Sequence, residues 1–436
     1  MTERKGVIMQ TTTKKTGMYN FGARGWSVVG FQIVWLFFMT GMTVDGLNII
    51  VPGIAAFRGW DPNTILSFST PASIIALILC ALWGGFIIKV GAKKTMLITM
   101  VAAGLATIFY GNAATIPLYF IALVLMVTLI NAFAINVGMA ITTNWFPTKK
   151  GVVMGVATIG MNLASALISQ ILNQLSGHWG ISGAITIMGC VILFVALLTA
   201  IFVKEKPEDA GCFPDNDPEV ARLIEAEEER TKDEKPAGYK QALKNKYVWL
   251  FGIAYGFFGM ATVGIMSQLV GFFMETRGWE LQTALNTVTI AAIIGMAGSV
   301  MWGTIDQKIG TKKTSTIFGI WYCIGILLLL APNTFIMWIG IVMLGAGIGG
   351  NGNFPPSMTA LAFGRKDFPT CYACVNTIVG IVRSCSFIIL AILRGFTAGY
   401  TVPYTFFAIV ALIGGLMFIF IHVKVAVGNE DYDHEG

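Results

Sequence analysis

The stretch Lys89-Val-Gly-Ala-Lys-Lys-Thr95 occurs twice in this chain, because Lys308-Ile-Gly-Thr-Lys-Lys-Thr314 repeats its glycine, its three lysines and its final threonine. The same offset in numbering (310 − 91 = 219) carries Arg58-Gly59-Trp60 onto Arg277-Gly278-Trp279. Between these landmarks both copies consist of long apolar runs. A repeat of this length, closed by a basic turn, is typical of a membrane protein built from two similar halves.

Composition also places the chain in a membrane. Residues of the set AVILMFWYC fill 55% of 436 positions, charged residues fill 12%, and the mean hydropathy is +0.72. Such values exceed what the surface of a soluble protein tolerates. The net charge of +6 does not indicate nucleic acid, because the lysines and arginines lie in short loops between apolar runs. We therefore expect an integral membrane protein without a nucleic-acid partner.

The apolar runs predict about twelve transmembrane helices, since about 20 apolar residues are needed to cross the core of a bilayer. Alternate loops carry the lysines, so these loops and both termini are predicted to face the cytoplasm in a multi-pass protein of the inner membrane. Residues 1–25 are polar and lack the apolar core of a signal peptide. The expected spans are 27–54, 64–88, 94–112, 115–142, 151–175, 181–203, 247–274, 282–304, 314–331, 334–362, 371–396 and 400–424.

One long polar interval separates two sets of six spans. Within it, Asp217-Pro218 is typical of a helix start, and Val220, Leu223 and Ile224 form a narrow apolar stripe. We expect a short helix that acts as a spacer, with a regulatory role as the alternative. The predicted architecture is an all-α membrane protein with a cytoplasmic tail at 1–25, a six-helix bundle at 26–204, a cytoplasmic linker at 205–246, a second six-helix bundle at 247–424 and a cytoplasmic tail at 425–436.

The turns after spans 2 and 8 resemble the signature of the major facilitator superfamily, in which a glycine is followed by an aspartate, basic residues and a second glycine. The first copy matches at Gly84, Lys89, Gly91, Lys93 and Lys94, and the second matches at Gly303, Lys308, Gly310, Lys312 and Lys313. The aspartate is missing, because Ile88 and Gln307 occupy its place and Asp306 lies one residue early. The resemblance implies two six-helix bundles and a cytoplasmic gate that contains Lys89, Gly91, Lys93, Lys308, Gly310 and Lys312.

A narrower resemblance is to the oxalate/formate antiporter and monocarboxylate porter branch. It rests on Asn144-Trp-Phe-Pro-Thr-Lys-Lys-Gly151, Gly155, Gly349-Gly350, Phe354-Pro355 and Phe363-Gly364. It implies a small organic anion, usually a carboxylate, that is held between the halves and moved by alternating access. In that branch basic residues of spans 8 and 11 bind the carboxylate. Here span 8 has no Lys or Arg, whereas span 11 offers Arg383.

Two charged side chains lie inside apolar spans, where an ionisable group costs at least ~2.5–3.5 kcal/mol and so indicates a function or a buried partner. Arg383 is near the middle of span 11, and its planar fork suits a carboxylate. Asp45 has no Lys or Arg in its own span, so we expect it to couple transport to protons or another cation. The alternatives are a structural pair of Asp45 with Arg383 or Arg394, and a bundle hydrogen bond.

Uncharged polar groups inside the spans are further candidates for substrate binding, although cross-helix hydrogen bonding is the more common role of such groups. In span 10, five glycines between 345 and 352 precede Pro355-Pro356 and predict a broken or bent helix, which survives at membrane depth only beside protein or a cavity. The substrate-binding residues that we predict are Arg383, Asn131, Asn351, Asn353, Gln268 and Asn376.

The sequence thus predicts a secondary carrier, with exchange for a counter-anion and symport with protons or Na⁺ both open. We expect a monomer in the lipid bilayer with a small anionic substrate, no cofactor and no bound metal. The alternative is a proton-coupled exporter of drugs or organic cations, which would use Asp45 and the aromatic residues of the spans. An enzyme is disfavoured because none of the three histidines, His178, His422 and His434, lies mid-span.

Overall fold

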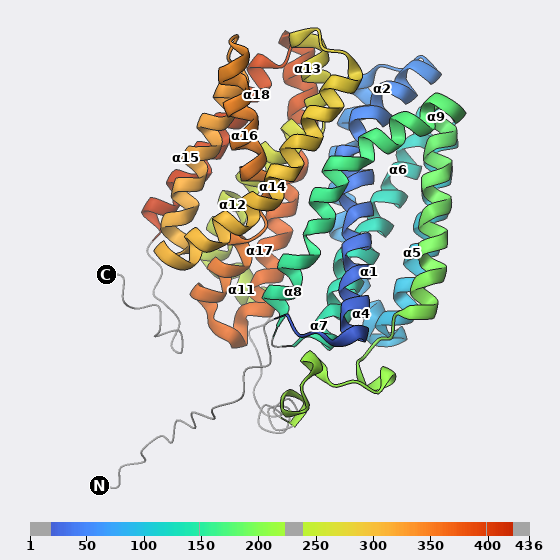
Figure 1. The fold of residues 1–436 in the computed structure, drawn as a ribbon, viewed down its shortest axis with the longest axis vertical. Coiled ribbons are helices and arrows are strands. Elements are labelled where there is room, and N and C mark those ends of the chain that lie inside the picture. Colours follow the sequence, from blue (N-terminus) through green and yellow to red (C-terminus); the bar gives the residue numbers. More distant parts are fainter. Residues whose placement is uncertain (1–18, 148, 223–238, 398, 422–436) are drawn as a thin grey trace.

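The computed structural model describes residues 19–147, 149–222, 239–397 and 399–421, and these residues form helices joined by short turns (Figure 1). No β-strand occurs among them. The helices of the first half gather on one side of the molecule and those of the second half on the other (Figure 1). The predicted fold class, an all-α protein built from two halves, is therefore confirmed.

The first half begins with a helix that is interrupted once. Its first span is α1, a π-helical turn η1 and α2, and a second π-helical turn, η2, interrupts the fourth span between α6 and α7. The elements are α1 (Gly22–Thr40), η1 (Gly41–Asp45), α2 (Leu47–Arg58), α3 (Pro62–Ser67), α4 (Ser69–Val90), α5 (Ala92–Asn112), α6 (Ile116–Asn131), η2 (Ala132–Val137), α7 (Gly138–Trp145), α8 (Lys150–Ala157) and α9 (Ile159–Phe202).

The second half has the corresponding order of helices, with its own break in the first span between α12 and α13. Its elements are α11 (Tyr239–Lys244), α12 (Lys246–Met266), α13 (Leu269–Arg277), α14 (Leu281–Ile309), α15 (Thr311–Leu329), α16 (Thr334–Gly350), α17 (Phe354–Thr397) and α18 (Thr401–Met417). Short 3₁₀ turns cover Glu208–Ala210, Pro214–Asn216 and Phe418–Phe420.

Within the described residues, ten helices are long and apolar enough to cross a membrane, and α16 together with the start of α17 makes an eleventh bent span. One of the ten, Val153–Phe202, is 50 residues long. At ~1.5 Å per residue it is far longer than the ~30 Å of a bilayer core. It contains two crossings, because Gly180 takes a left-handed φ of 68° where the chain turns back (Figure 1). The described chain thus supplies the twelve crossings predicted.

The break predicted for span 10 is confirmed. Helix α16 ends at Gly350, α17 begins at Phe354, and the two are bent by 45°. The glycines also allow α16 to approach α14 closely, because a Cβ at position 349 would lie 1.8 Å from the Gly295 carbonyl oxygen. The glycine-rich sequence therefore serves both the bend and the close packing of two helices.

Residues at equivalent positions of the sequence repeat make equivalent contacts in the two halves. Arg58 donates to Asn112 O at 3.4 Å, and Arg277 donates to Ala331 O, which has the same offset in numbering (331 − 112 = 219). Trp60 packs on Tyr119 with ring centroids 5.7 Å apart, and Trp279 packs on Trp338 at 6.5 Å, again at this offset (338 − 119 = 219). Each arginine bonds to carbonyls at or just after the end of the third span of its half, where a positive charge is favourable.

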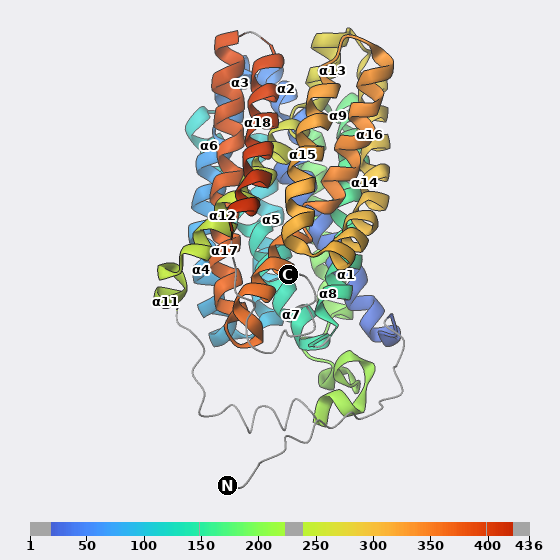
Figure 2. The same ribbon diagram turned by 90° about the vertical axis from the view of Figure 1, so that its left-hand side faces the viewer.

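Two ends of the molecule can be named from these elements. The end with the turns at Gly91 and Gly310 is the lysine-rich end, and the end with the turns at Gly59, Gly180 and Gly278 is the lysine-poor end. Helices α7, α8 and α11 lie toward the first, and α2, α3 and α13 toward the second (Figures 1 and 2).

The linker contacts the lysine-rich end. Lys149 donates from its backbone to Asp215 Oδ1 at 3.3 Å and from Nζ to Asp215 O at 3.1 Å. A helix begins at residue 218, and Asp217 accepts the Glu219 N–H at 3.0 Å. The predicted helix beyond residue 222, including Leu223 and Ile224, lies outside the described residues.

Candidate functional site

Asp45 ends the π-helical turn η1 and is 1% exposed. The turn is held by a hydrogen bond from the Gly46 N–H to Gly41 O at 2.7 Å, and a Cβ at position 46 would lie 2.4 Å from that oxygen, so the turn requires glycine there. The Ser165 hydroxyl donates to Asp45 Oδ2 at 2.6 Å, and the Ser169 hydroxyl donates to Asp45 O at 2.9 Å. π-Turns are rare overall, and those that occur are often found at functional sites.

Arg383 lies near the middle of span 11, which runs from Thr370 to Thr397. Its aliphatic stem packs on α12, where a Cβ at Gly259 would lie 3.2 Å from Arg383 Cδ. For the part of the chain that the structure describes, no hydrogen bond or ion pair to the guanidinium is recorded. Arg383 and Asp45 therefore do not form the ion pair that was the structural alternative for both.

Arg394, the other possible partner of Asp45, is engaged elsewhere. Its guanidinium pairs with Glu275 and lies 4.4 Å from the ring centre of Tyr400, at the lysine-poor end. The two arginines of span 11 therefore differ: Arg394 is paired with Glu275 near the membrane surface, whereas Arg383 at mid-depth has no recorded negative partner among the described residues.

Helix α12 brings a second predicted residue close to Arg383. Asn351 donates to the Thr262 hydroxyl at 3.2 Å, and that hydroxyl also lies 3.0 Å from the Tyr322 hydroxyl. Thr262 is three residues after Gly259 and therefore on the same side of α12, about one turn along the helix. The aliphatic stem of Arg383 and the amide of Asn351 consequently contact adjacent turns of one helix.

The other predicted residues are placed less directly. Asn353 donates to Ser299 O at 3.3 Å and so joins the break in span 10 to α14, and Asn131 donates to Val127 O in its own helix at 2.8 Å. Asn376 is exposed and lies two turns before Arg383 on the same face of α17. Gln268 lies in the break between α12 and α13, 6% exposed, with no hydrogen bond to its Nε2 among the described atoms.

The turn after span 2 is held by a carboxylate that the sequence signature did not identify. Gly91 has a φ of 93° there, and Lys89 is exposed. Glu205, just after span 6, accepts the Ala92 N–H at 3.0 Å and the Lys93 N–H at 3.1 Å. These are the first amides of α5, where a negative charge is favourable. Lys93 Nζ itself donates to Ala200 O at 2.9 Å.

The turn after span 8 has the same backbone but no recorded side-chain cap among the described residues. Gly310 has a φ of 82°, and Lys308 is exposed whereas Lys312 is half-buried. The Gly310 N–H donates to the backbone carbonyl of Asp306 at 3.0 Å, and Asp306 Oδ1 is buried without a hydrogen bond among the described residues. The recorded contacts of both turns lie within their own halves, so the gating role of their lysines stays a prediction.

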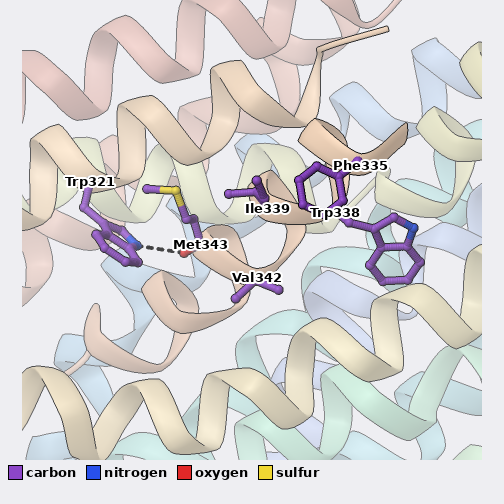
Figure 3. A pocket seen from close by; sticks show the side chains of 6 residues that line it. All are labelled: Trp321, Phe335, Trp338, Ile339, Val342 and Met343. Atoms are coloured by element: carbon purple, nitrogen blue, oxygen red, sulfur yellow. Dashed lines mark hydrogen bonds between the residues drawn. The ribbon is translucent and has the colours of Figure 1, made fainter. Parts of the chain in front are cut away.

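A groove on the outside of the second half is entirely apolar. Trp321, Phe335, Trp338, Ile339, Val342 and Met343 of α15 and α16 line it (Figure 3). Its one polar link, from Trp321 Nε1 to Met343 O at 3.0 Å, is internal to the wall (Figure 3). It contains none of the predicted polar residues and is not the site for a charged substrate. Among the described residues, no group of three or more His, Cys, Asp or Glu side chains could hold a metal ion.

Comparison of the sequence with known protein families identifies the family of this chain. The profile of the major facilitator superfamily matches residues 33–363, which is more than half of the chain. The chain belongs to the major facilitator superfamily. The crystal structure of a D-xylose-proton symporter has the same fold, with a TM-score of 0.67 at 14% identity, over 90% of this chain and 96% of that one. As a member of this superfamily the protein is a multi-pass membrane transporter and not an enzyme.

The curated relatives are distant. A probable hexose phosphate transport protein of Chlamydia trachomatis serovar D is 21% identical over 263 residues, or 56% of each chain, so this chain spans little more than half of that relative. The uncharacterised transporter YhjX of Escherichia coli is 20% identical over 68% of this chain and 71% of its own length. A probable sulfoacetate transporter, SauU, of Cupriavidus necator is 21% identical over 79% and 81%.

Proposed function

We propose that this transporter moves a small organic anion with a carboxylate group across the cytoplasmic membrane by alternating access, and that Arg383 binds the carboxylate. The observation that carries the proposal is the position of Arg383: the residue lies at mid-span, its stem packs on Gly259, and the described residues offer no negative partner for its guanidinium. A charge in such a place is costly unless a ligand compensates it. A carboxylate does so with two parallel hydrogen bonds.

Nearby polar groups complete the site. Asn351 on the Thr262 hydroxyl, one turn along α12 from Gly259, and the exposed Asn376, two turns along α17, are the groups that a substrate at Arg383 would reach first. Asp45 on the other half supplies a carboxylate for proton coupling, either in symport with the anion or in antiport. The lysine-rich end, with its turns at Gly91 and Gly310, faces the cytoplasm in this proposal.

An organic phosphate is the second candidate, because relatives of this chain are named as hexose phosphate transporters. Charge favours the carboxylate. A phosphomonoester carries about −1.5 to −2 charges at pH 7, which one guanidinium neutralises only in part. A monocarboxylate is neutralised fully. An organic cation is disfavoured, because the charge of Arg383 would repel it.

Binding to the purified protein tests the proposal. Mono- and dicarboxylates, hexose phosphates and short sulfonates are compared for binding to the wild-type protein and to Arg383→Lys and Arg383→Gln. We expect a carboxylate to bind best, Arg383→Lys to weaken it severalfold because the fork is lost, and Arg383→Gln to weaken it about tenfold or more.

Arg394→Gln is the matched control, because it removes an arginine from the same helix whose charge is already paired with Glu275. It should bind the substrate as the wild type does. Unchanged affinity in Arg383→Gln would refute the direct contact. Tighter binding of hexose phosphates than of any carboxylate, lost in Arg383→Gln, would keep the site and change the substrate class.

A further inference from the structure

Asn48 in α2 bonds across the two halves to the backbone of the second half. Its Nδ2 donates to Met266 O at 2.8 Å, and its Oδ1 accepts the Val270 N–H at 3.1 Å. The carbonyl belongs to residue i and the N–H to residue i+4, which are the two groups that bond to each other in an α-helix. One carboxamide thus takes the place of one backbone hydrogen bond of another helix.

The place where this occurs is the break in the first span of the second half. Helix α12 ends at Met266 and α13 begins at Leu269. No proline lies there to force the break, since the sequence is Met266-Ser-Gln-Leu-Val270. A side chain inserted into the hydrogen-bond ladder is a sufficient cause of such a kink. Asn48 is 6% exposed, so its amide has little access to water in this state.

Thr70 in α4 makes the same pattern on a different helix. Its hydroxyl donates to Ser384 O at 2.7 Å and accepts the Ile388 N–H at 2.9 Å, again residues i and i+4. Here α17 runs on without a break. The comparison separates two cases: Asn48 has replaced a helical hydrogen bond, whereas Thr70 has been added to an intact helix.

Both contacts lie toward the lysine-poor end of the molecule. The other hydrogen bonds recorded between described residues of the two halves lie there as well. Gln170 of α9 bonds to Asn286 and Thr289 of α14, and the Thr289 hydroxyl donates to Ala166 O at 2.7 Å. The halves are therefore joined at the lysine-poor end in this structure.

We propose that Asn48 is a reversible latch of the lysine-poor end, and that α12 and α13 join into one helix when the latch opens. On opening, the Met266 carbonyl and the Val270 N–H exchange Asn48 for each other, so neither backbone group is left without a partner. The Asn48 amide then meets the water that enters the opened end. The exchange keeps the number of unsatisfied buried groups low in both states, which makes the transition inexpensive.

The latch also touches the coupling residue. Asn48 Nδ2 donates to Asp45 O at 2.9 Å as well as to Met266 O, and Ser169 shares the same Asp45 carbonyl. A change in the turn η1 at Asp45 is therefore transmitted to the break in the facing helix through a single side chain. The inference rests on the proposed transport function for its purpose, but the opening itself can be measured without a substrate.

The test measures the distance between spin labels at Trp179 and Phe335, which are exposed side chains at lysine-poor turns of the two halves. The full-length protein, with its seven cysteines replaced and its fold checked, carries the two labels in lipid nanodiscs. We expect a shorter distance in the parent and a gain of the long-distance population by about fivefold to tenfold in Asn48→Leu, which loses both bonds to the second half at similar volume. Thr70→Val should cause a smaller gain.

Asn112→Leu is the matched control, because Asn112 lies at the same end and the recorded hydrogen bonds of its carboxamide stay within its own half: Nδ2 donates to Ile108 O and Thr186 Oγ1, and Oδ1 accepts from the Ser182 hydroxyl. It should leave the distance unchanged. Hydrogen exchange of the segment around Val270 tests the joining of the helices. In Asn48→Leu the Val270 amide should stay protected, since Met266 O replaces Asn48 as its acceptor.

Each result decides one part of the inference. An unchanged distance in Asn48→Leu would overturn the latch, and rapid exchange at Val270 in the opened protein would overturn the joining of α12 and α13. Neither result bears on anion binding at Arg383, which is measured separately. Conversely, a protein that binds no carboxylate would still show the distance change if the latch is real.

Discussion

The two halves of this transporter share their framework and differ in their charges. Gly91 and Gly310 have nearly the same backbone angles, with φ of 93° and 82° and ψ of 153° and 150°. By contrast, the offset of the repeat (310 − 91 = 219) carries Asp45 onto Gly264 and Arg383 back onto Ala164. Each mid-span charge thus corresponds to a small uncharged residue at the equivalent place in the other half. The repeat explains the fold, and the departures from the repeat carry the proposed chemistry.

The largest effect is expected at Asp45, the acidic residue that departs from the repeat. Asp45→Asn should abolish accumulation of substrate driven by a proton gradient, because the amide cannot take up and release a proton, while exchange of substrate for substrate continues. Uptake into proteoliposomes under an imposed pH gradient, compared with counterflow, measures both. If Asp45→Asn still concentrates substrate normally, the carboxylate is structural and serves as the acceptor of the Ser165 hydrogen bond.

Asp61→Asn is the control for that experiment. Asp61 is an exposed N-cap outside the spans, and the hydrogen bond from the Thr64 hydroxyl lowers the pKa of its carboxyl. A carboxyl whose pKa is lowered in the folded protein stays ionised near neutral pH, and its contribution to stability is lost only as the pH falls through that lowered value. The Asp61→Asn variant should therefore keep proton-driven uptake.

The shared framework predicts a matched pair of stability losses at the two basic turns. At Gly91 and Gly310 an L side chain is strained at the observed φ, so Gly91→Ala and Gly310→Ala should each destabilise by about 1–3 kcal/mol. At Gly91 the new methyl group would in addition lie 3.1 Å from Glu205 Oε2. Thermal unfolding followed by tryptophan fluorescence should show a lower midpoint for both and the larger drop for Gly91→Ala. A loss at one turn alone would break the equivalence of the halves.

The sequence predicts a structural feature when the residues that cause the feature lie close together in the chain. Apolar runs and glycines predict the repeat, the twelve crossings and the break of span 10. The two mid-span charges are easily identified because the residues around them are apolar. The branch-level resemblance reached further than the comparisons support, since named relatives are described as hexose phosphate or sulfoacetate transporters. The break at Met266 has no proline to signal it, and the side chain that bonds to the backbone there lies 218 residues away in the sequence.

Two other features were missed for a similar reason. A π-turn adds one residue to a helix, but the spans that contain η1 and η2 are apolar on most sides and offer no one-sided pattern whose shift would reveal the extra residue. Glu205 was missed because the superfamily signature places the acidic residue of the turn at position 88, which is Ile88 here. The glutamate lies far from that position in the sequence, and its place just after span 6 is the only local sign of a capping role.

The arginines at the lysine-poor turns predict a graded difference between the halves. Arg277 donates to the carbonyls of Leu329, Ala331 and Pro332, whereas a single hydrogen bond of Arg58, to Asn112, is recorded. Each replacement by Gln removes a positive charge from the end of a helix, an effect of about 0.3–1 kcal/mol. Arg277→Gln should therefore lower the unfolding midpoint more than Arg58→Gln does. Equal losses would show that the extra hydrogen bonds contribute nothing.

The smallest expected effect tests how the first basic turn manages without the aspartate of the signature. Glu205 accepts the first two amides of α5, whereas no side-chain cap is recorded at the start of α15 among the described residues, so the two halves reach one backbone shape with different capping. Glu205→Gln keeps an acceptor oxygen and loses the charge, which should cost about 0.3–1 kcal/mol. Glu208→Gln, at an exposed position three residues further on, is the control and should cost nothing measurable. The difference should shrink in high salt, because a partly exposed charge at a helix terminus is screened. A loss in Glu205→Gln that matches Glu208→Gln at low salt would mean that the glycine alone shapes the turn, and that the carboxylate is a passive neighbour.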